Sequence, residues 1–411
     1  MPQDMHHHGE GDIEMTKVVM TGNYAQSYAA KLAKVQVVAA YPITPQTSIV
    51  EKVAEFVSTG EMKTQYIKVE SEHSALQACI SAAALGARAY TATSSQGLLL
   101  MHELLFWAAG NRAPIVMGIV NRAVAPPWSI WADHTDSIAQ RDTGWIQYYC
   151  ESNQEVLDTV LQAYRVVESQ DVLLPAMVME DAFYLSHTVE AVDVPPQSAV
   201  DQYVPKLKSP WVLEMEKTMR MGSFMMPDLY TEFRYKIAKG MVDARKRIIE
   251  ADDEYGRRFG RSYGGLVQEY RCDDADVVLL ATGTAASTAR EVVDEMRKEG
   301  KKVGLARLRV FRPFPKQEII DIASRVRTLG VFDRSWGFGF SGPVGTEVAG
   351  VLYRSKAKPL LKDYVVGLGG RDVTPAVLKG MFTDLLQLKG ESFETEWVGL
   401  KRPEREVGPD A

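Results

Sequence analysis

The segment VQVVAAYPITP, residues 35–45, is the clearest sign of the fold. Five of its first six residues are apolar and three of these are valine, which predicts a buried strand. Two prolines then bracket Thr44, and because proline disrupts the interior of helices and strands, the strand must end in a fixed loop. A helix is expected from Thr47 to Val57. The stretch therefore predicts one strand–loop–helix unit, with Thr44 at the carboxyl end of the strand.

The same alternation of strand and helix continues through residues 17–192. Further strands are predicted at Gln65–Val69, Arg88–Thr93, Pro114–Val120, Trp145–Cys150 and Leu173–Met179. Helices are predicted between them, the clearest at Glu72–Leu85 and Gln154–Glu168. Strands that alternate with helices form a mostly parallel sheet covered on both faces. Residues 17–192 are therefore expected to fold as one doubly wound α/β domain.

A second α/β unit is predicted over residues 268–388. It begins with the apolar strand Val277–Ala281, which a helix from Ala285 to Glu299 follows. Residues 193–267 lie between the two units and are expected to form a proline-containing extended linker and then a long charged helix, about Tyr230–Glu254. The fold class is thus α/β, with two doubly wound parallel-sheet domains.

The two ends of the chain are polar. Residues 1–16 are expected to form a disordered or extended tail, and residues 389–411 a tail that wraps over the surface or a partner. His6, His7 and His8 could bind a stray metal ion, but a polar extension is the favoured interpretation.

Composition excludes several classes of protein. The chain has 411 residues and a formal net charge of −6, which gives no reason to expect nucleic acid or an anionic membrane as a partner. No apolar run is long enough to span a membrane, and the N-terminus lacks a secretory signal, so a cytoplasmic protein is expected. The cysteines are only three and widely spaced, which excludes a disulfide framework and an iron–sulfur cluster held by this chain alone.

Six short motifs in order make a family recognisable. They are Tyr41–Pro45, Glu70–Ala75, Thr93–Gly97, Asn121–Val124, His134–Ser137 and Arg141–Trp145. Together they resemble the alpha subunit of pyruvate:ferredoxin oxidoreductases and related 2-oxoacid oxidoreductases, which depend on thiamine diphosphate. The resemblance runs from about residue 17 to 385 and includes Arg312–Pro315 and Gly367–Thr374. It implies a pyrimidine-binding first domain and a second domain like the transketolase C-terminal domain, to which no catalytic residue is assigned.

Glu72 is the residue that the resemblance places at the centre of catalysis. In thiamine enzymes a carboxyl group bonds N1′ of the aminopyrimidine and favours the imino tautomer, which removes the C2 proton. A glutamate between a strand and an alanine-rich helix suits this role because burial raises its pKa. The residue types alone favour a plainer role, a glutamate that stabilises the helix N-terminus. Glu70 is the nearby competitor, but it should point away.

Thr44 and Arg122 resemble the pair that orients the substrate carboxylate. Arginine offers a permanently charged, two-pronged donor, and a threonine hydroxyl adds a directional one. Taken singly, Thr44 is as consistent with a turn-capping hydroxyl and Arg122 with a surface ion pair.

The remaining candidates are expected to line the pocket. Cofactor-binding candidates are Pro45, Ser95 and Gln96, beside Glu72. Substrate-pocket candidates are Ile43, Trp128, Trp131 and His134. His134 could move a proton or form a structural bond to Asp133 or Asp136. The tryptophans could shape the pocket or bury area between subunits.

A missing motif predicts the partners. Thiamine enzymes usually bind Mg²⁺ and the diphosphate through a Gly-Asp-Gly motif, which this chain lacks. No metal site is therefore expected here. The resemblance implies that a beta-type subunit brings Mg²⁺ and the diphosphate site, and that gamma-type and ferredoxin-like delta-type subunits complete the complex with [4Fe-4S] clusters.

The implied reaction is coenzyme A-dependent oxidative decarboxylation of a 2-oxoacid to acyl-CoA and CO₂. Pyruvate is the expected substrate, with phenylglyoxylate or a branched-chain 2-oxoacid as alternatives. Two other functions stay open at this point: one half of a non-oxidative thiamine enzyme, and a structural or regulatory subunit without catalysis. The residues do not identify the acceptor, the physiological direction or the stoichiometry.

Overall fold

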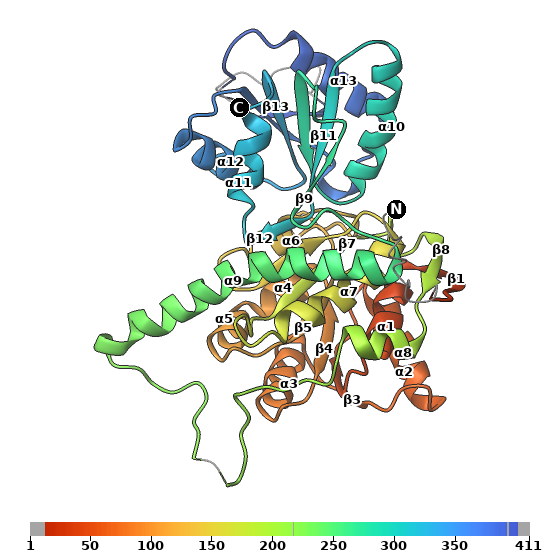
Figure 1. The fold of residues 1–411 in the computed structure, drawn as a ribbon, viewed down its shortest axis with the longest axis vertical. Coiled ribbons are helices and arrows are strands. Elements are labelled where there is room, and N and C mark those ends of the chain that lie inside the picture. Colours follow the sequence, from red (N-terminus) through yellow and green to blue (C-terminus); the bar gives the residue numbers. More distant parts are fainter. Residues whose placement is uncertain (1–12, 217, 393, 402–411) are drawn as a thin grey trace, which may run out of the picture.

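The computed structural model describes residues 13–216, 218–392 and 394–401. Two sheets form the centres of two lobes that follow one another along the chain (Figure 1). The outer parts of the predicted tails, residues 1–12 and 402–411, lie outside the described residues. Ile13 and Met15 pack against the first core, so the described chain joins this lobe slightly earlier than position 17.

The first lobe is built on a seven-stranded sheet with the order β12-β6-β7-β5-β4-β2-β3. Its strands are β2 (Val37–Ala40), β3 (Gln65–Lys68), β4 (Ala89–Thr93), β5 (Val116–Asn121), β6 (Ile146–Tyr149), β7 (Ala176–Asp181) and β12 (Val310–Arg312). The neighbouring strands from β6 to β3 are parallel, as the alternating pattern predicts. Their carboxyl ends therefore meet at one edge, where α/β proteins bind ligands.

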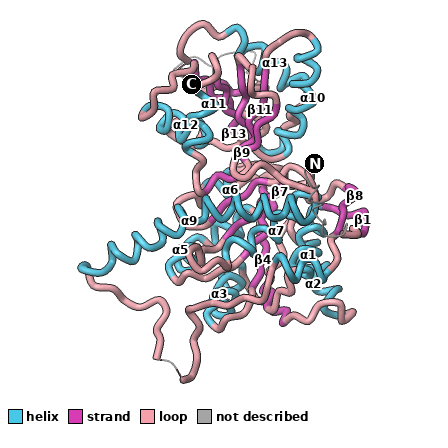
Figure 2. The backbone as a smooth tube through the Cα atoms, in the orientation of Figure 1, coloured by secondary structure: helices cyan, strands magenta, loops and turns pink. Residues whose placement is uncertain are grey.

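Helices cover both faces of this sheet (Figure 2). The helices of the lobe are α1 (Gly22–Leu32), α2 (Thr47–Ser58), α3 (Glu72–Ala84), α4 (Ser95–Leu100), α5 (His102–Gly110), α6 (Thr135–Ile138) and α7 (Asn153–Val167). One core lies under α1, α2 and α7, and another lies under α3 and α5. Because both faces are buried, strands β4, β5, β6 and β7 are buried along their whole length.

The second lobe contains a six-stranded sheet with the order β15-β14-β13-β10-β11-β9. Its strands are β9 (Val267–Tyr270), β10 (Val277–Ala281), β11 (Val303–Leu308), β13 (Thr328–Asp333), β14 (Leu360–Val365) and β15 (Glu396–Trp397), and only β9 pairs antiparallel. Its helices are α10 (Thr284–Lys298), α11 (Lys316–Ala323), α12 (Pro343–Tyr353), the short η1 (Leu368–Gly370) and α13 (Pro375–Gln387). Two α/β lobes confirm the predicted fold class.

The C-terminal half contributes one strand to the first sheet. β12 (Val310–Arg312) pairs antiparallel with β6, although its residues fall inside the range 268–388 expected for the second domain. Two fully buried arginines, Arg307 and Arg309, lie just before β12, and both bind the buried carboxylate of Glu155 at the start of α7. Arg309 Nε lies 3.0 Å from Glu155 Oε1. The ion pairs of Arg307 and Arg309 with Glu155 thus connect the two lobes at the point where the chain returns to the first sheet.

The connection between the lobes is more ordered than its sequence suggests. β8 (Val189–Val194) pairs with β1 (Thr16–Thr21), and a short helix α8 (Gln197–Tyr203) follows it, so among the described residues of this connection the extended part is confined to 204–216 and 218–226. The long charged helix is α9 (Pro227–Phe259), longer at both ends than expected. The extended stretch and the beginning of α9 project from the body as an arm (Figure 1).

Candidate active site

Four loops meet at the carboxyl edge of the first sheet. They follow β2, β3, β4 and β5. Thr44 and Arg122 lie on these loops, and Glu72 and Gln96 lie at the starts of the helices α3 and α4 that follow them. Since neighbouring parallel strands end side by side, these residues come together although 78 positions separate Thr44 from Arg122. This edge therefore contains most of the residues that the sequence indicated.

Glu72 is the first residue of α3, where the side chain of Ser71 caps the helix by accepting a hydrogen bond from the N–H of Ser74. Glu72 is only 6% exposed, and burial raises the pKa of its carboxyl group. Glu70, in contrast, is exposed and accepts a hydrogen bond from the Ser74 hydroxyl. Of the two carboxylates, only Glu72 is directed into the sheet edge.

The carboxylate of Glu72 lies against Gly97. A Cβ atom built on this glycine would be 2.6 Å from Glu72 Oε1 and would also overlap the hydroxyl of Thr93. Any side chain at position 97 would therefore displace the glutamate or the start of α4. The glycine in the motif Thr93–Gly97 thus has a steric role beside Glu72.

Arg122 bridges two of the loops through neutral oxygens. Its Nη1 donates to the carbonyl of Thr44 at 2.6 Å, and its Nη2 donates to Oε1 of Gln96 at 2.9 Å. Its Nε has no hydrogen-bond partner among the described residues, and no carboxylate there pairs with its guanidinium. Arg122 is thus a nearly buried cation, 5% exposed, without a directly paired anion.

The loop after β4 holds an unusual backbone conformation. Ser95 has a φ of +47°, a left-handed value that residues with a side chain seldom adopt. Its hydroxyl bonds Gln96 Oε1 and the carbonyl of Ala123, both at 2.6 Å. Ser95 and Gln96 therefore belong to the same network as Arg122.

Two buried amides secure the Thr44 loop. Asn23 Nδ2 donates to the carbonyl of Pro45 at 2.7 Å, and Gln46 Nε2 donates to the carbonyl of Ala92 at 2.9 Å. Ile43 is half-buried beside Gln46, while Thr44 itself is exposed. Asn23 and Gln46 were not predicted as site residues, because nothing in the local sequence pattern separates them from ordinary residues of a helix or its first turn.

Asp136 is a further residue that the sequence analysis did not assign to the site. It is fully buried, and burial raises its pKa to about 6. It lies within the motif His134–Ser137, where the sequence suggested it only as a possible partner of His134, and the structure pairs His134 with Asp181 instead.

His134 belongs to a separate cluster between the lobes. Its Nε2 bonds Asp181 Oδ1 at 2.6 Å, and its ring faces Tyr149. Arg334 Nη1 binds the other oxygen of Asp181 at 3.0 Å, and the N–H of Thr284 donates to it as well. The aspartate that binds His134 is thus 47 positions away in the first lobe rather than one of its sequence neighbours, and Arg334 and Thr284 link that aspartate to the second lobe.

Trp128 and Trp131 lie on the exposed loop that follows Arg122. Trp131 packs on Phe183, with ring centroids 4.4 Å apart. It lines a hollow of about 620 Å³ between the lobes. The other residues of this hollow are Phe183, Tyr184, Thr188, Leu368, Gly369, Gly370, Arg371 and Asp372.

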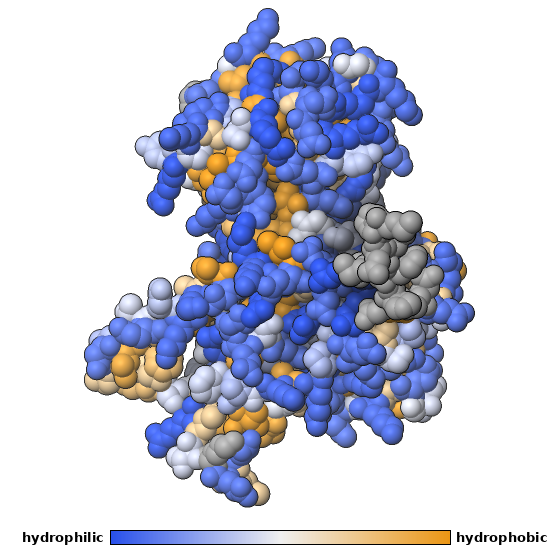
Figure 3. Space-filling model, in the orientation of Figure 1, coloured by the Kyte–Doolittle hydropathy of each residue, from blue (hydrophilic) through white to orange (hydrophobic). Residues whose placement is uncertain are grey.

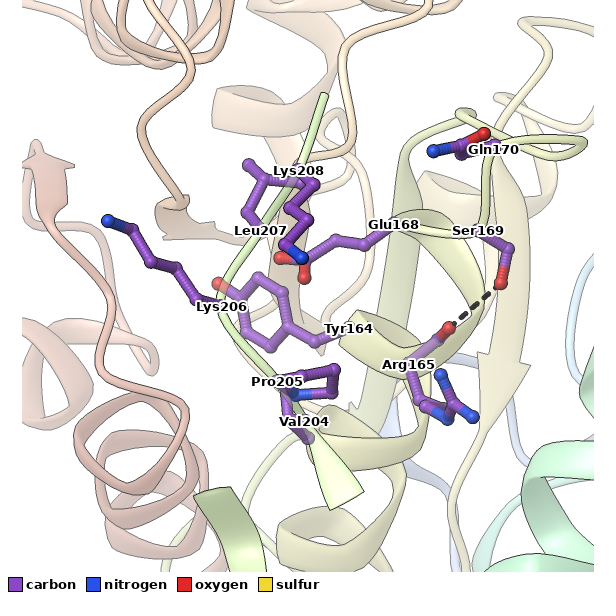
Figure 4. Close-up of a pocket in the computed structure, with 10 residues that line it drawn as sticks. All are labelled: Tyr164, Arg165, Glu168, Ser169, Gln170, Val204, Pro205, Lys206, Leu207 and Lys208. Atoms are coloured by element: carbon purple, nitrogen blue, oxygen red, sulfur yellow. Dashed lines mark hydrogen bonds between the residues drawn. The ribbon is translucent and has the colours of Figure 1, made fainter. Parts of the chain in front are cut away.

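A smaller hollow, about 220 Å³, lies between the end of α7 and residues 204–208 (Figure 4). Tyr164 and Glu168 point into it, and Glu168 is bound there by Arg88, which precedes β4. This is the amino edge of the sheet, opposite the loops that carry Glu72 and Arg122. The described residues contain no group of His, Cys, Asp and Glu suited to a metal ion.

Comparisons with known proteins identify this arrangement. Residues 28–253 match the thiamine diphosphate-binding family model of pyruvate flavodoxin/ferredoxin oxidoreductases, and residues 275–378 match core domain II of pyruvate:ferredoxin oxidoreductase. The chain belongs to the 2-oxoacid:ferredoxin oxidoreductase family. This confirms the resemblance carried by the six motifs and establishes the chain as a subunit of an oxidoreductase.

Two relatives of this oxidoreductase family align over almost their whole length. The ketoisovalerate oxidoreductase subunit VorA of Pyrococcus horikoshii is 53% identical over 94% of this chain and 98% of the relative. The pyruvate synthase subunit PorA of Methanothermobacter thermautotrophicus is 48% identical over 94% and 99%.

A solved oxidoreductase shares the fold. The 2-oxoglutarate:ferredoxin oxidoreductase of Magnetococcus marinus superposes with a TM-score of 0.69 at 17% identity, over 90% of this chain. The match spans 65% of that longer chain.

Proposed function

We propose that this chain is the subunit that activates the thiamine pyrimidine in a coenzyme A-dependent 2-oxoacid:ferredoxin oxidoreductase. The observation that carries the proposal is the buried carboxyl group of Glu72, with its raised pKa, at the edge where the substrate-orienting candidate Arg122 also lies. The family match places thiamine diphosphate binding in this part of the chain.

The residues present fit the pyrimidine half of the cofactor. A carboxyl group whose pKa is raised by burial can share a proton with a ring nitrogen, so Glu72 would hold N1′ of the pyrimidine. Pro45, Ser95 and Gln96 lie on adjacent loops of this edge and would complete the surface around the ring. When bound, thiamine diphosphate supplies the nucleophilic carbon and the electron sink for decarboxylation.

Arg122 would orient the carboxylate of the 2-oxoacid. Its guanidinium touches only neutral oxygens, so its charge is available to an anion, and a carboxylate is the shape that arginine binds best. Thr44 is exposed next to it, and its hydroxyl could donate a second directional bond. Both residues would hold the substrate before the carbon–carbon bond breaks.

The reaction needs other subunits. We infer that a beta-type subunit brings Mg²⁺ and the diphosphate site, and that gamma-type and ferredoxin-like delta-type subunits bring the coenzyme A site and the [4Fe-4S] clusters that accept the electrons. The projecting arm supports an assembled state, because it exposes apolar side chains (Figure 3). They are Trp211, Leu213, Met215, Phe224, Met226, Leu229, Tyr230 and Phe233.

We infer an aliphatic 2-oxoacid as the substrate, either pyruvate or its branched-chain analogue 2-oxoisovalerate. The relatives with about half of their residues identical are subunits of enzymes named for these two acids. No helix among the described residues is long and apolar enough to cross a membrane, and we propose that the complex acts in the cytoplasm.

The experiment that tests the proposal compares Glu72→Gln with wild type in the purified native complex. Coenzyme A-dependent reduction of a viologen dye is measured with pyruvate, 2-oxoisovalerate and phenylglyoxylate. We expect Glu72→Gln to lower kcat by about 100-fold or more, since the proton transfer it supports contributes that much. The best substrate of the wild type settles the specificity.

Glu70→Gln is the matched control, because Glu70 is two positions away but exposed. It should leave kcat unchanged. Full turnover by an assembled Glu72→Gln complex would reject the pyrimidine-activating role and leave a structural or regulatory subunit. Turnover without any cluster-bearing partner would instead favour a non-oxidative thiamine enzyme.

A further inference from the structure

The carboxylate of Asp136 is the point at which two site loops are joined. Its Oδ2 accepts the backbone N–H of Ser95 and that of Arg122, each at 3.0 Å. Its Oδ1 accepts Nδ2 of Asn121 at 2.7 Å and the N–H of Ser137 at 2.8 Å. One buried side chain thus satisfies donors at the ends of both β4 and β5.

Sharing one oxygen between two backbone N–H groups fixes the distance between the two loops. The first loop holds Ser95 in its left-handed conformation, and the second begins with Arg122. Because Gln96 follows Ser95 directly, the same oxygen also sets how far the Arg122 guanidinium lies from Gln96 Oε1. The backbone position of Arg122 therefore depends on a residue that does not itself reach its guanidinium.

We propose that Asp136 is a positioning residue for the arginine that binds the substrate carboxylate. The proposal rests on the proposed function of Arg122, and it adds that Asp136 holds the backbone of Arg122 in place. All four donors are N–H groups, so position 136 needs a side chain whose two terminal atoms both accept. Asparagine has nearly the same shape, but its NH₂ group would face one pair of these donors.

A purely structural aspartate would act differently. Losing it would lower the stability of the complex and leave the affinity for each substrate unchanged in molecules that remain folded. A positioning residue instead weakens the one substrate that its arginine holds. An interaction made equally before and during the reaction changes KM and leaves kcat nearly unaltered.

The test measures KM and kcat for the 2-oxoacid and for coenzyme A in the purified complex carrying Asp136→Asn. We expect the KM for the 2-oxoacid to rise about tenfold or more, as for the loss of one charge-assisted contact. The value of kcat should change less than KM, and the KM for coenzyme A should stay at the wild-type value.

Ser137→Ala is the matched control. Ser137 is also buried and bonds Asn121 Nδ2 at 2.7 Å, but it does not touch Ser95 or Arg122. It should lower stability without raising the KM for the 2-oxoacid. If both variants raise that KM equally, Asp136 is merely structural and the proposal is overturned.

Arg122→Gln separates this inference from the proposed function. A raised KM in Arg122→Gln with a normal KM in an assembled Asp136→Asn complex would overturn the positioning role and leave the role of Arg122 intact. A normal KM in Arg122→Gln would overturn both. If Asp136→Asn does not assemble, Asp136→Glu takes its place, because it keeps the charge but displaces both oxygens. A wild-type KM in Asp136→Glu would reject the proposal.

Discussion

Gly97 leaves the space that the carboxylate of Glu72 occupies. A Cβ atom at position 97 would lie 2.6 Å from Glu72 Oε1, well inside van der Waals contact. The two residues come from different strand–helix units, and the contact exists only because β4 and β2 are neighbours in the sheet with α3 packed over both.

Gly97→Ala should therefore impair the chemistry without unfolding the lobe. The added methyl group would push the Glu72 carboxyl group away from its position. We expect kcat to fall by about tenfold or more, because the displaced carboxyl group would no longer reach N1′ of the thiamine pyrimidine. Titration of thiamine diphosphate into the apo complex should show weaker binding. Gly110→Ala is the control, since a Cβ there meets no atom within 4 Å. Equal behaviour of the two variants would contradict the steric role of Gly97.

Arg122→Lys should raise the KM for the 2-oxoacid by about 10- to 100-fold. A lysine ammonium has no planar fork, so it loses one of the bonds to Thr44 and Gln96 as well as the paired grip on a carboxylate. Steady-state kinetics with the best 2-oxoacid tests this expectation. Arg141→Lys, on the partly exposed surface, should keep the wild-type KM. An unchanged KM in Arg122→Lys would exclude two-pronged recognition.

Glu155→Gln should destabilise the connection between the lobes. The variant leaves the fully buried Arg307 and Arg309 without their shared carboxylate, and breaking a buried pair costs about 3–5 kcal/mol. Thermal unfolding of the purified protein measures the loss. Glu318→Gln removes a partly exposed partner of Arg245 and should cost less than about 1 kcal/mol. Similar losses in both variants would argue against a special role for the buried charges.

Asp181 should make the stability depend on acid pH. Burial alone would raise the pKa of this carboxyl, but Arg334 and His134 outweigh burial and hold it below its usual range. A lowered pKa means that the stabilisation is complete above the unfolded value of about 3.9 and is lost as the pH falls below it.

The difference in unfolding free energy between wild type and Asp181→Asn should thus be constant from about pH 7 to 5 and shrink at lower pH by about 1.4 kcal/mol per unit. Chemical denaturation across this range tests the expectation. The exposed Asp142→Asn variant should show no such change. A difference that stays constant down to about pH 3 would contradict it.

Much of the first lobe follows from local pattern. Val37–Ala40 and Gln65–Lys68 are short apolar or alternating runs, and their turns and helices carry their own start and stop signals, so both strands were expected within one or two residues. Helix α8 and strand β1 were not predicted. Each is short and is stabilised by packing against residues distant in the sequence rather than by a hydrophobic periodicity of its own.

Most candidate site residues were predictable because motifs mark the loops where parallel strands end. Glu72, Gln96 and Arg122 do lie at one edge of the sheet. The role of Asp136 was not predicted, because its shared bond to the backbone N–H groups of Ser95 and Arg122 exists only when β4 and β5 lie side by side. His134 was among the predicted site residues, but no local pattern pairs it with Asp181, which lies 47 positions away.

The succession of strands and helices, the family and the residue types available for chemistry follow from the sequence, because they depend on periodicity and short motifs. Three features follow only from the folded arrangement: β12 returns to the first sheet, Asp136 joins Ser95 to Arg122, and Asp181 binds residues from both lobes. These are contacts between positions far apart in the chain. Burial and charge pairing select them only when the whole molecule has folded.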